Sequence, residues 1–102
     1  IARFKMALFI VESEISRMDE RMARLIPKQR AFVEEMFERG VFHMYAVSEN
    51  LDKWWCSIEA DSEEDVHRIL EDMPIIDWLN PTINGLMFYN IYPLWLNLEY
   101  LS

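Results

Sequence analysis

The sequence has little glycine, little cysteine and no long uninterrupted apolar run. With only 2 glycines in 102 residues, it has no glycine-rich loop that could hold a phosphate. Its single cysteine, Cys56, excludes an internal disulfide and fits a reducing compartment such as the cytoplasm. No apolar run reaches the roughly 18 residues of a transmembrane helix. One cysteine and 2 histidines show no metal-ligand spacing, so no metal site is expected.

Positive charge is scarce as well. The chain carries 10 Lys and Arg against 18 Asp and Glu, a formal net charge of -8. An acidic surface repels both phosphates and anionic lipid headgroups, so neither nucleic acid nor a membrane is an expected partner. Acidity also keeps a protein soluble, so the sign of the charge does not by itself identify a partner.

What the sequence has in excess is apolar surface. Hydrophobic residues make up 52% of it, including 7 Met and 4 Trp, which is more than a domain of this size buries easily. We expect self-association to bury this surface, and a ligand cavity is the second possibility. We expect one domain over residues 1–90 and then an apolar extension, 91–102, that packs on a partner subunit or, alternatively, on its own subunit.

Apolar periodicity, helix caps and breaks predict six elements. The strands are expected at residues 4–11, 41–47, 53–60 and 82–90, and the helices at 16–39 and from Asp61 or Ser62 to Pro74. Pro27 interrupts the first helix, which is either one kinked helix, the favoured interpretation, or two helices. The order β-α-β-β-α-β predicts a ferredoxin-like α+β fold, with an antiparallel four-stranded sheet and helices on one face only.

Alternation along the strands assigns side chains to the two faces of the sheet. The hairpin register that separates apolar from mixed residues sets Met44 opposite Cys56 and Tyr45 opposite Trp55. Adjacent Trp54 and Trp55 then face opposite sides, and Cys56 is expected to be a buried, inert thiol. The residues expected to pack beneath the helices are Phe4, Met6, Leu8, Ile10, Val33, Phe37, Met44, Cys56, Ile58, Ile69 and Leu70.

The same alternation gathers polar and aromatic side chains on the helix-free face. His43 and Glu59 are the candidate catalytic residues, because histidine titrates near neutral pH and a carboxylate beside a cation can act as a base. Such a pair suits proton transfer next to a carbonyl. The candidate ligand-binding residues around it are Arg3, Lys5, Tyr45, Trp55, Ser57 and Asn84. Alternatively, this face is only a dimer interface, where aromatic residues and Arg are favoured without any ligand.

Residues 40–86 resemble muconolactone isomerase without a gap. The matching landmarks are Gly40 opening a strand, Ser62 at a helix cap, His67 and Leu70 within that helix, Pro74 after it, an aromatic at Trp78, and Gly85 with Leu86. The apolar pattern of the first helix also fits. The segments around Pro27 and at residues 86–90 are closer to small relatives of that family than to the isomerase itself.

The resemblance implies a dimeric α+β barrel, in which two four-stranded sheets pack through their helix-free faces, and larger rings of such dimers. It also implies proton transfer on an unsaturated lactone without metal or cofactor. Because this chain has Ala46 and Val47 where the isomerase has a basic residue, the resemblance supplies no catalytic residue of its own.

Two functions are therefore open. The first is a muconolactone isomerase-like protein that binds a small carbonyl compound or moves a proton on it. The second is a non-catalytic, homo-oligomeric assembly protein whose barrel interior is simply packed. Space between the two sheets near His43 and Glu59 would favour the first.

Overall fold

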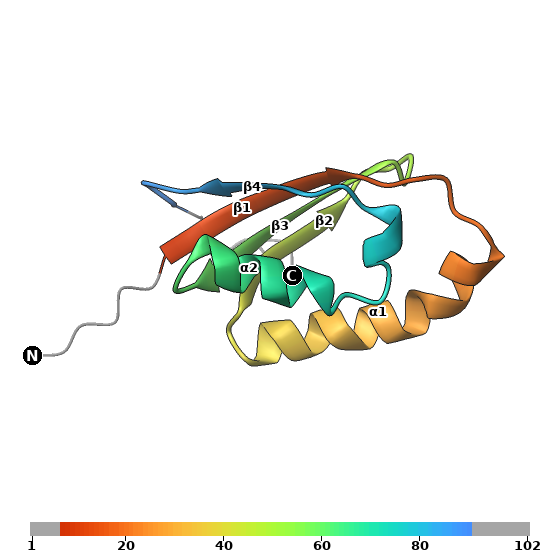
Figure 1. Cartoon of the computed structure of the whole chain (residues 1–102), viewed down its shortest axis with the longest axis horizontal. Helices are drawn as coiled ribbons and strands as arrows, with labels where there is room; N and C mark the ends of the chain where they lie inside the picture. Colours follow the sequence, from red (N-terminus) through yellow and green to blue (C-terminus); the bar gives the residue numbers. More distant parts are fainter. Residues whose placement is uncertain (1–6, 91–102) are drawn as a thin grey trace, which may run out of the picture.

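The computed structural model describes residues 7–90, which form one antiparallel sheet with two helices on one of its faces (Figure 1). The strands are β1 (Ala7–Glu14), β2 (Phe42–Val47), β3 (Lys53–Ala60) and β4 (Thr82–Gly85). The helices are α1 (Glu20–Glu38), α2 (Glu63–Glu71) and the short 3-10 helix η1 (Ile76–Trp78). The strand order β2-β3-β1-β4 and the βαββαβ sequence confirm the predicted ferredoxin-like α+β fold.

Helix α1 is a single helix that contains Pro27. It begins later than predicted because Asp19, rather than an earlier residue, caps it: the Asp19 carboxylate accepts from the backbone N–H of Met22 at 2.8 Å. The helix ends before Gly40, whose positive φ of 73° is the left-handed conformation that favours glycine. The predicted stop at Gly40 is therefore confirmed.

Helix α2 is capped by Ser62, one of the two residues predicted for this place. The Ser62 hydroxyl accepts from the backbone N–H of Asp65 at 3.2 Å. Val66, Leu70 and Met73 are buried against the sheet, as their spacing of three and four residues predicts. The apolar stripe of α2 is thus confirmed.

The facing of β1 was predicted the wrong way round. Phe9 and Val11 are buried beneath the helices, opposite Ile58 and Cys56 of β3, whereas Leu8 and Ile10 lie half-buried on the other face. The strand extends beyond the predicted range to Glu14, and Glu12 and Glu14 make the even-numbered set the polar one. Phe4 and Met6, which were assigned to the core with Leu8 and Ile10, lie outside the described residues.

The predicted register of β2 on β3 is right at Phe42, which lies opposite Ile58, and wrong beyond it. A β-bulge at His43 shifts the pairing by one residue, so that Tyr45 rather than Met44 lies opposite Cys56. Both Phe42 and Tyr45 therefore face the helices, where their rings stack at a centroid distance of 6.1 Å. Met44 moves to the helix-free face, contrary to the prediction.

The core lies between the helices and the sheet and is rich in aromatic and sulfur-bearing side chains. Trp54, predicted to face opposite to Trp55, is fully buried there. Phe37 is 43% exposed, so its assignment to the core was wrong. Of the other predicted core residues, Cys56, Ile58 and Leu70 are buried, while Val33 and Ile69 are partly buried against them.

Strand β4 is shorter than predicted, because its pairing with β1 ends just after Gly85. The last contact of this ladder runs from the backbone N–H of Leu86 to the carbonyl of Leu8 at 2.9 Å. The Tyr89 hydroxyl then lies 3.4 Å from Ser57 Oγ in β3. Since β1 separates β4 from β3 in the sheet, the Tyr89 side chain reaches past β1 on the helix-free face. The apolar extension at 91–102 lies outside the described residues.

Candidate functional site

The helix-free face of the sheet carries a half-buried apolar strip. Ile10 of β1 lies opposite Ser57 of β3 on one side and Asn84 of β4 on the other. Met44 of β2 lies opposite Ser57 from the far side. Neither α1 nor α2 covers this face (Figure 1). Ile10 and Met44 are the apolar members of this strip, and because no helix covers them we take this face as the candidate site.

His43 and Glu59 form a polar pair at the β2 edge of this face. His43 Nε2 and Glu59 Oε1 are within hydrogen-bond distance at 2.7 Å, and the two side chains are 36% and 26% exposed. The bulge in β2 occurs at His43 itself, so His43 reaches Glu59 although the pairing beyond it is shifted. The two candidate catalytic residues lie on adjacent strands as predicted, but the register behind that prediction is wrong, because Met44 rather than His43 lies opposite Ser57.

Ser57 lies two residues from Glu59 on the same face of β3, about 7 Å along the strand. Its side chain is fully buried, and its hydroxyl meets that of Tyr89 at 3.4 Å. Tyr89 therefore occupies the space directly above Ser57. His43, Glu59 and Ser57 are the predicted residues that the fold brings closest together.

Trp55 and Asn84 share the face but stand apart from the His43–Glu59 pair. Trp55 is four residues from Glu59 on β3, about 13 Å away, and its indole N–H donates to Glu12 at 3.2 Å. Asn84 is exposed on β4, separated from β3 by β1. These two residues can bound a site on this face, but they lie away from the His43–Glu59 pair.

Tyr45, predicted as a ligand-binding residue of this face, lies on the opposite side of the sheet. The bulge turns it beneath α1, where its hydroxyl accepts from the Gln29 side chain at 3.0 Å. Its ring stacks on Trp54 at a centroid distance of 5.7 Å, and burial raises the pKa of its hydroxyl. Arg3 and Lys5, also predicted to bind ligand, lie outside the described residues.

The sequence-based prediction missed Ile10, Met44 and Tyr89 as residues of this face. Ile10 was assigned to the core because the predicted strand ended before Glu12 and Glu14. These two carboxylates lie on the same face as Ile10 and show that this face does not pack beneath the helices. Met44 was missed because nothing in the local sequence marks a bulge. Tyr89 was placed in a strand, although the strand ends before it.

Burial raises the pKa of the Cys56 thiol well above its usual range. The sulfur is fully enclosed on the helix side of the sheet, which confirms that the thiol is buried; its inertness stays a prediction. Among residues 7–90, no three His, Cys, Asp or Glu side chains are arranged to hold a metal ion. No helix in this part of the chain is long and apolar enough to cross a membrane.

Comparison with known proteins supports the fold. No family model and no curated protein matches the sequence. Among solved structures, that of MtbAldR (Rv2779c) is similar with a TM-score of 0.53 and 15% identity, over 84% of this chain and 57% of MtbAldR. PA3566 from Pseudomonas aeruginosa has a TM-score of 0.49 and 12% identity, over 89% of this chain and 100% of that protein. This chain thus spans little more than half the length of MtbAldR, and the likeness shows a shared α+β fold alone.

Proposed function

We propose that this domain is a homodimeric, muconolactone isomerase-like protein that binds a small carbonyl compound on its helix-free face and moves a proton on it. The observation that carries the proposal is the 2.7 Å contact between His43 and Glu59, on a face that also carries the half-buried apolar side chains of Ile10 and Met44. A second copy packed on this face would cover its apolar strip and exclude water from the pair. Exclusion of water strengthens the electrostatic interaction of a charged pair with a bound carbonyl.

The contact determines the role of each side chain. In the proposed mechanism the Glu59 carboxylate accepts from Nε2–H, so a neutral His43 carries its lone pair on Nδ1. Nδ1 can accept a proton from the carbon next to a carbonyl, and the electrons of the broken C–H bond pass into an enolate. The imidazolium then returns the proton to another carbon of the conjugated system, so no oxidant or reductant is consumed. Glu59 acts as a positioning residue that stabilises the imidazolium.

Isomerisation of α-angelica lactone, an unsaturated lactone, tests the proposal. The double bond migrates into conjugation with the carbonyl, which ultraviolet absorbance follows. His43→Gln should lower the rate by about a hundredfold, the usual contribution of a positioned base. Glu59→Gln should change the pH dependence of the rate. His67→Gln is the matched control, because that histidine lies on α2 and contacts only Glu63, at 3.8 Å, within the part of the chain described.

Two results decide the test. If all three variants isomerise the lactone at the wild-type rate, or if the wild type does not exceed buffer, the proton-transfer proposal is wrong for this class of substrate. If His43→Gln loses activity, Glu59→Gln changes the pH dependence of the rate and His67→Gln keeps the wild-type rate, all with unchanged circular dichroism, the results support proton transfer by the pair.

The second candidate is a non-catalytic assembly protein with a packed interior. The contact between Tyr89 and Ser57 favours it, because the chain's own segment already occupies part of the helix-free face. In that case Tyr89→Ala should weaken self-association and His43→Ala should do the same. For the ligand-binding protein, Tyr89→Ala should instead enlarge the site and leave the proton-transfer pair in place.

A further inference from the structure

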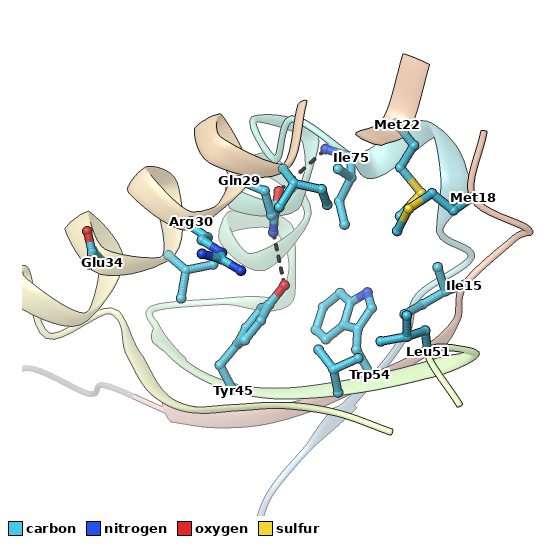
Figure 2. A pocket seen from close by; sticks show the side chains of 13 residues that line it. Ile15, Met18, Met22, Gln29, Arg30, Glu34, Tyr45, Leu51, Trp54 and Ile75 are labelled. Carbon is cyan, nitrogen blue, oxygen red and sulfur yellow. Dashed lines mark hydrogen bonds between the residues drawn. The ribbon is translucent and has the colours of Figure 1, made fainter. Parts of the chain in front are cut away.

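A cavity of about 510 Å³ lies on the helix side of the sheet, between the N-terminal half of α1 and the β2–β3 hairpin. Figure 2 shows its wall, with Met22 on one side of Trp54 and Tyr45 on the other. Exposed Met18 and Val47 lie at its mouth. Protein interiors are close-packed, and apolar surfaces of this size are usually covered. The cavity therefore calls for an occupant.

The polar atoms inside the cavity are not available to such an occupant. The Gln29 side chain donates to the Tyr45 hydroxyl at 3.0 Å and accepts from the backbone N–H of Ile75 at 3.4 Å (Figure 2). The Trp54 indole N–H is buried beneath the cavity surface, out of reach. The occupant is therefore held by burial of apolar surface rather than by hydrogen bonds.

The sequence itself contains a segment of this chemistry. Of the 12 residues at positions 91–102, which lie outside the described part of the chain, 8 are hydrophobic and only Glu99 is charged. Leu94, Leu96 and Leu98 alternate, so they share one side of the segment when it is extended. A segment this apolar needs a surface to pack on.

The cavity lies within reach of this segment. The Tyr89 hydroxyl is 3.4 Å from Ser57 on β3, and β3 pairs with the edge strand β2. Val47 of β2 lies opposite Trp54, three residues from Ser57 along β3. Crossing one strand, moving three residues along it and passing to the other face of the sheet takes about 25 Å. An extended segment of 12 residues spans about 40 Å, which leaves several residues to lie in the cavity.

We infer that residues 91–102 pass around the edge of β2 and fill the cavity beneath α1 of their own chain. The inference goes beyond the proposed function, since it requires neither a ligand nor the His43–Glu59 pair. Of the two positions expected for the apolar extension, it selects the extension's own subunit over a partner subunit.

A nitroxide label on the full-length variant Asn97→Cys tests the inference by nuclear magnetic resonance. The label should broaden the amide resonances of Met18 and Val47, at the cavity mouth, more strongly than that of Asn84 on β4. Cys56 is fully buried, so the reagent should leave it unmodified. The wild type treated with the same reagent is the control for this, and its resonances should stay sharp.

A mixed sample separates the chain's own segment from that of a partner subunit. Isotope-enriched, labelled Asn97→Cys is unfolded in urea and refolded with an excess of unenriched wild type. Broadening at the cavity mouth should persist, because the label and the cavity belong to one chain. If the excess removes this broadening, the segment comes from a partner subunit and the inference is overturned.

Two carboxylates at the mouth should displace the segment. Met18→Glu with Val47→Glu changes two side chains that are each 44% exposed, so the fold should survive, and covering these carboxylates with an apolar segment is costly. In this background the broadening at the cavity mouth should be lost. Ala23→Glu with Ala31→Glu is the matched control, because it adds the same charge to exposed positions of α1 outside the cavity wall.

Three further results would overturn the inference. One is a label that broadens Asn84 as strongly as the cavity mouth, and another is a label that broadens no amide of the described residues. The third is an equal effect of the two pairs of substitutions, because the added charge rather than the cavity would then decide where the segment lies.

Discussion

Trp54 and Trp55 are adjacent in β3 and serve opposite faces of the sheet. Trp54 is fully buried beneath α1 and stacks on Tyr45 at 5.7 Å, whereas the Trp55 indole donates to Glu12 at 3.2 Å on the helix-free face. The aromatic excess of the sequence is thus divided between two surfaces. One surface encloses a cavity, and the other carries the His43–Glu59 pair and the apolar strip.

The aromatic cluster beneath α1 should depend on Phe42 far more than on Phe37. Phe42 is buried and contacts three other rings, so Phe42→Ala should lower the free energy of unfolding by about 3–5 kcal/mol. Phe37 is 43% exposed and meets only the edge of Phe42, so Phe37→Ala should cost about 1 kcal/mol. Urea denaturation measures both, and equal losses would contradict the observed packing.

Leu51 should be replaceable with a gain in stability. It has a positive φ of 62°, a conformation that L side chains other than Asn and Asp rarely adopt, and it is 60% exposed. Leu51→Asn should therefore raise the free energy of unfolding by about 0.5–1 kcal/mol. Leu51→Ala is the control, because it removes the same side chain without relieving the strain. An equal effect of the two substitutions would refute the strain at this position.

Cys56 should be unreactive in the folded protein. Burial raises its pKa, so the thiol stays neutral and iodoacetamide should modify it at least about a hundredfold more slowly than in urea. In the unfolded chain the thiol ionises from about pH 8.5, so the stability that Cys56 contributes is present below this pH and is lost as the pH rises above it. Cys56→Ala should flatten this alkaline loss. Rapid labelling under native conditions would contradict the burial.

Asp19 should make the free energy of unfolding decrease at acidic pH. Its pKa is lowered, first by the backbone N–H of Met22 and further by the Trp78 indole and Arg21. A lowered pKa means that the contribution is present above the ordinary value of about 3.9 and is lost as the pH falls below it. Asp19→Asn keeps the cap but cannot titrate, so thermal melts should lose this acid dependence. Asp19→Ala should also lower the Tm at pH 7.

The element order and several boundaries could be predicted from the sequence because they depend on local signals. Gly40 ends α1 through its left-handed backbone, and Ser62 caps α2. Strand β3 has the predicted bounds, Lys53–Ala60, because buried and less buried side chains alternate along it. Long-range relations were harder to predict. One example is the choice of which face of β1 turns toward the helices. The predicted strand stopped before Glu12, whose carboxylate shows that the even-numbered residues form the polar face.

The candidate site could be predicted only in part, and the bulge at His43 explains why. It keeps His43 beside Glu59 but turns Tyr45 from the helix-free face to the core. No glycine or proline marks the bulge in the sequence. Its result is that Tyr45 stacks between Phe42 and Trp54. The cavity beneath α1 could not be predicted at all, because its volume depends on the separation of helix and sheet rather than on residue type.

Self-association through the helix-free face is most directly tested by sedimentation equilibrium of the wild type, Ile10→Arg and Val47→Arg at micromolar concentration. Ile10 lies in the middle of that face, between Ser57 and Asn84, whereas Val47 is an exposed apolar residue opposite Trp54 at the edge of the sheet. The account predicts a dimer for the wild type and Val47→Arg, and a folded monomer for Ile10→Arg. A monomeric wild type, or a dimer that Ile10→Arg leaves intact, would contradict it.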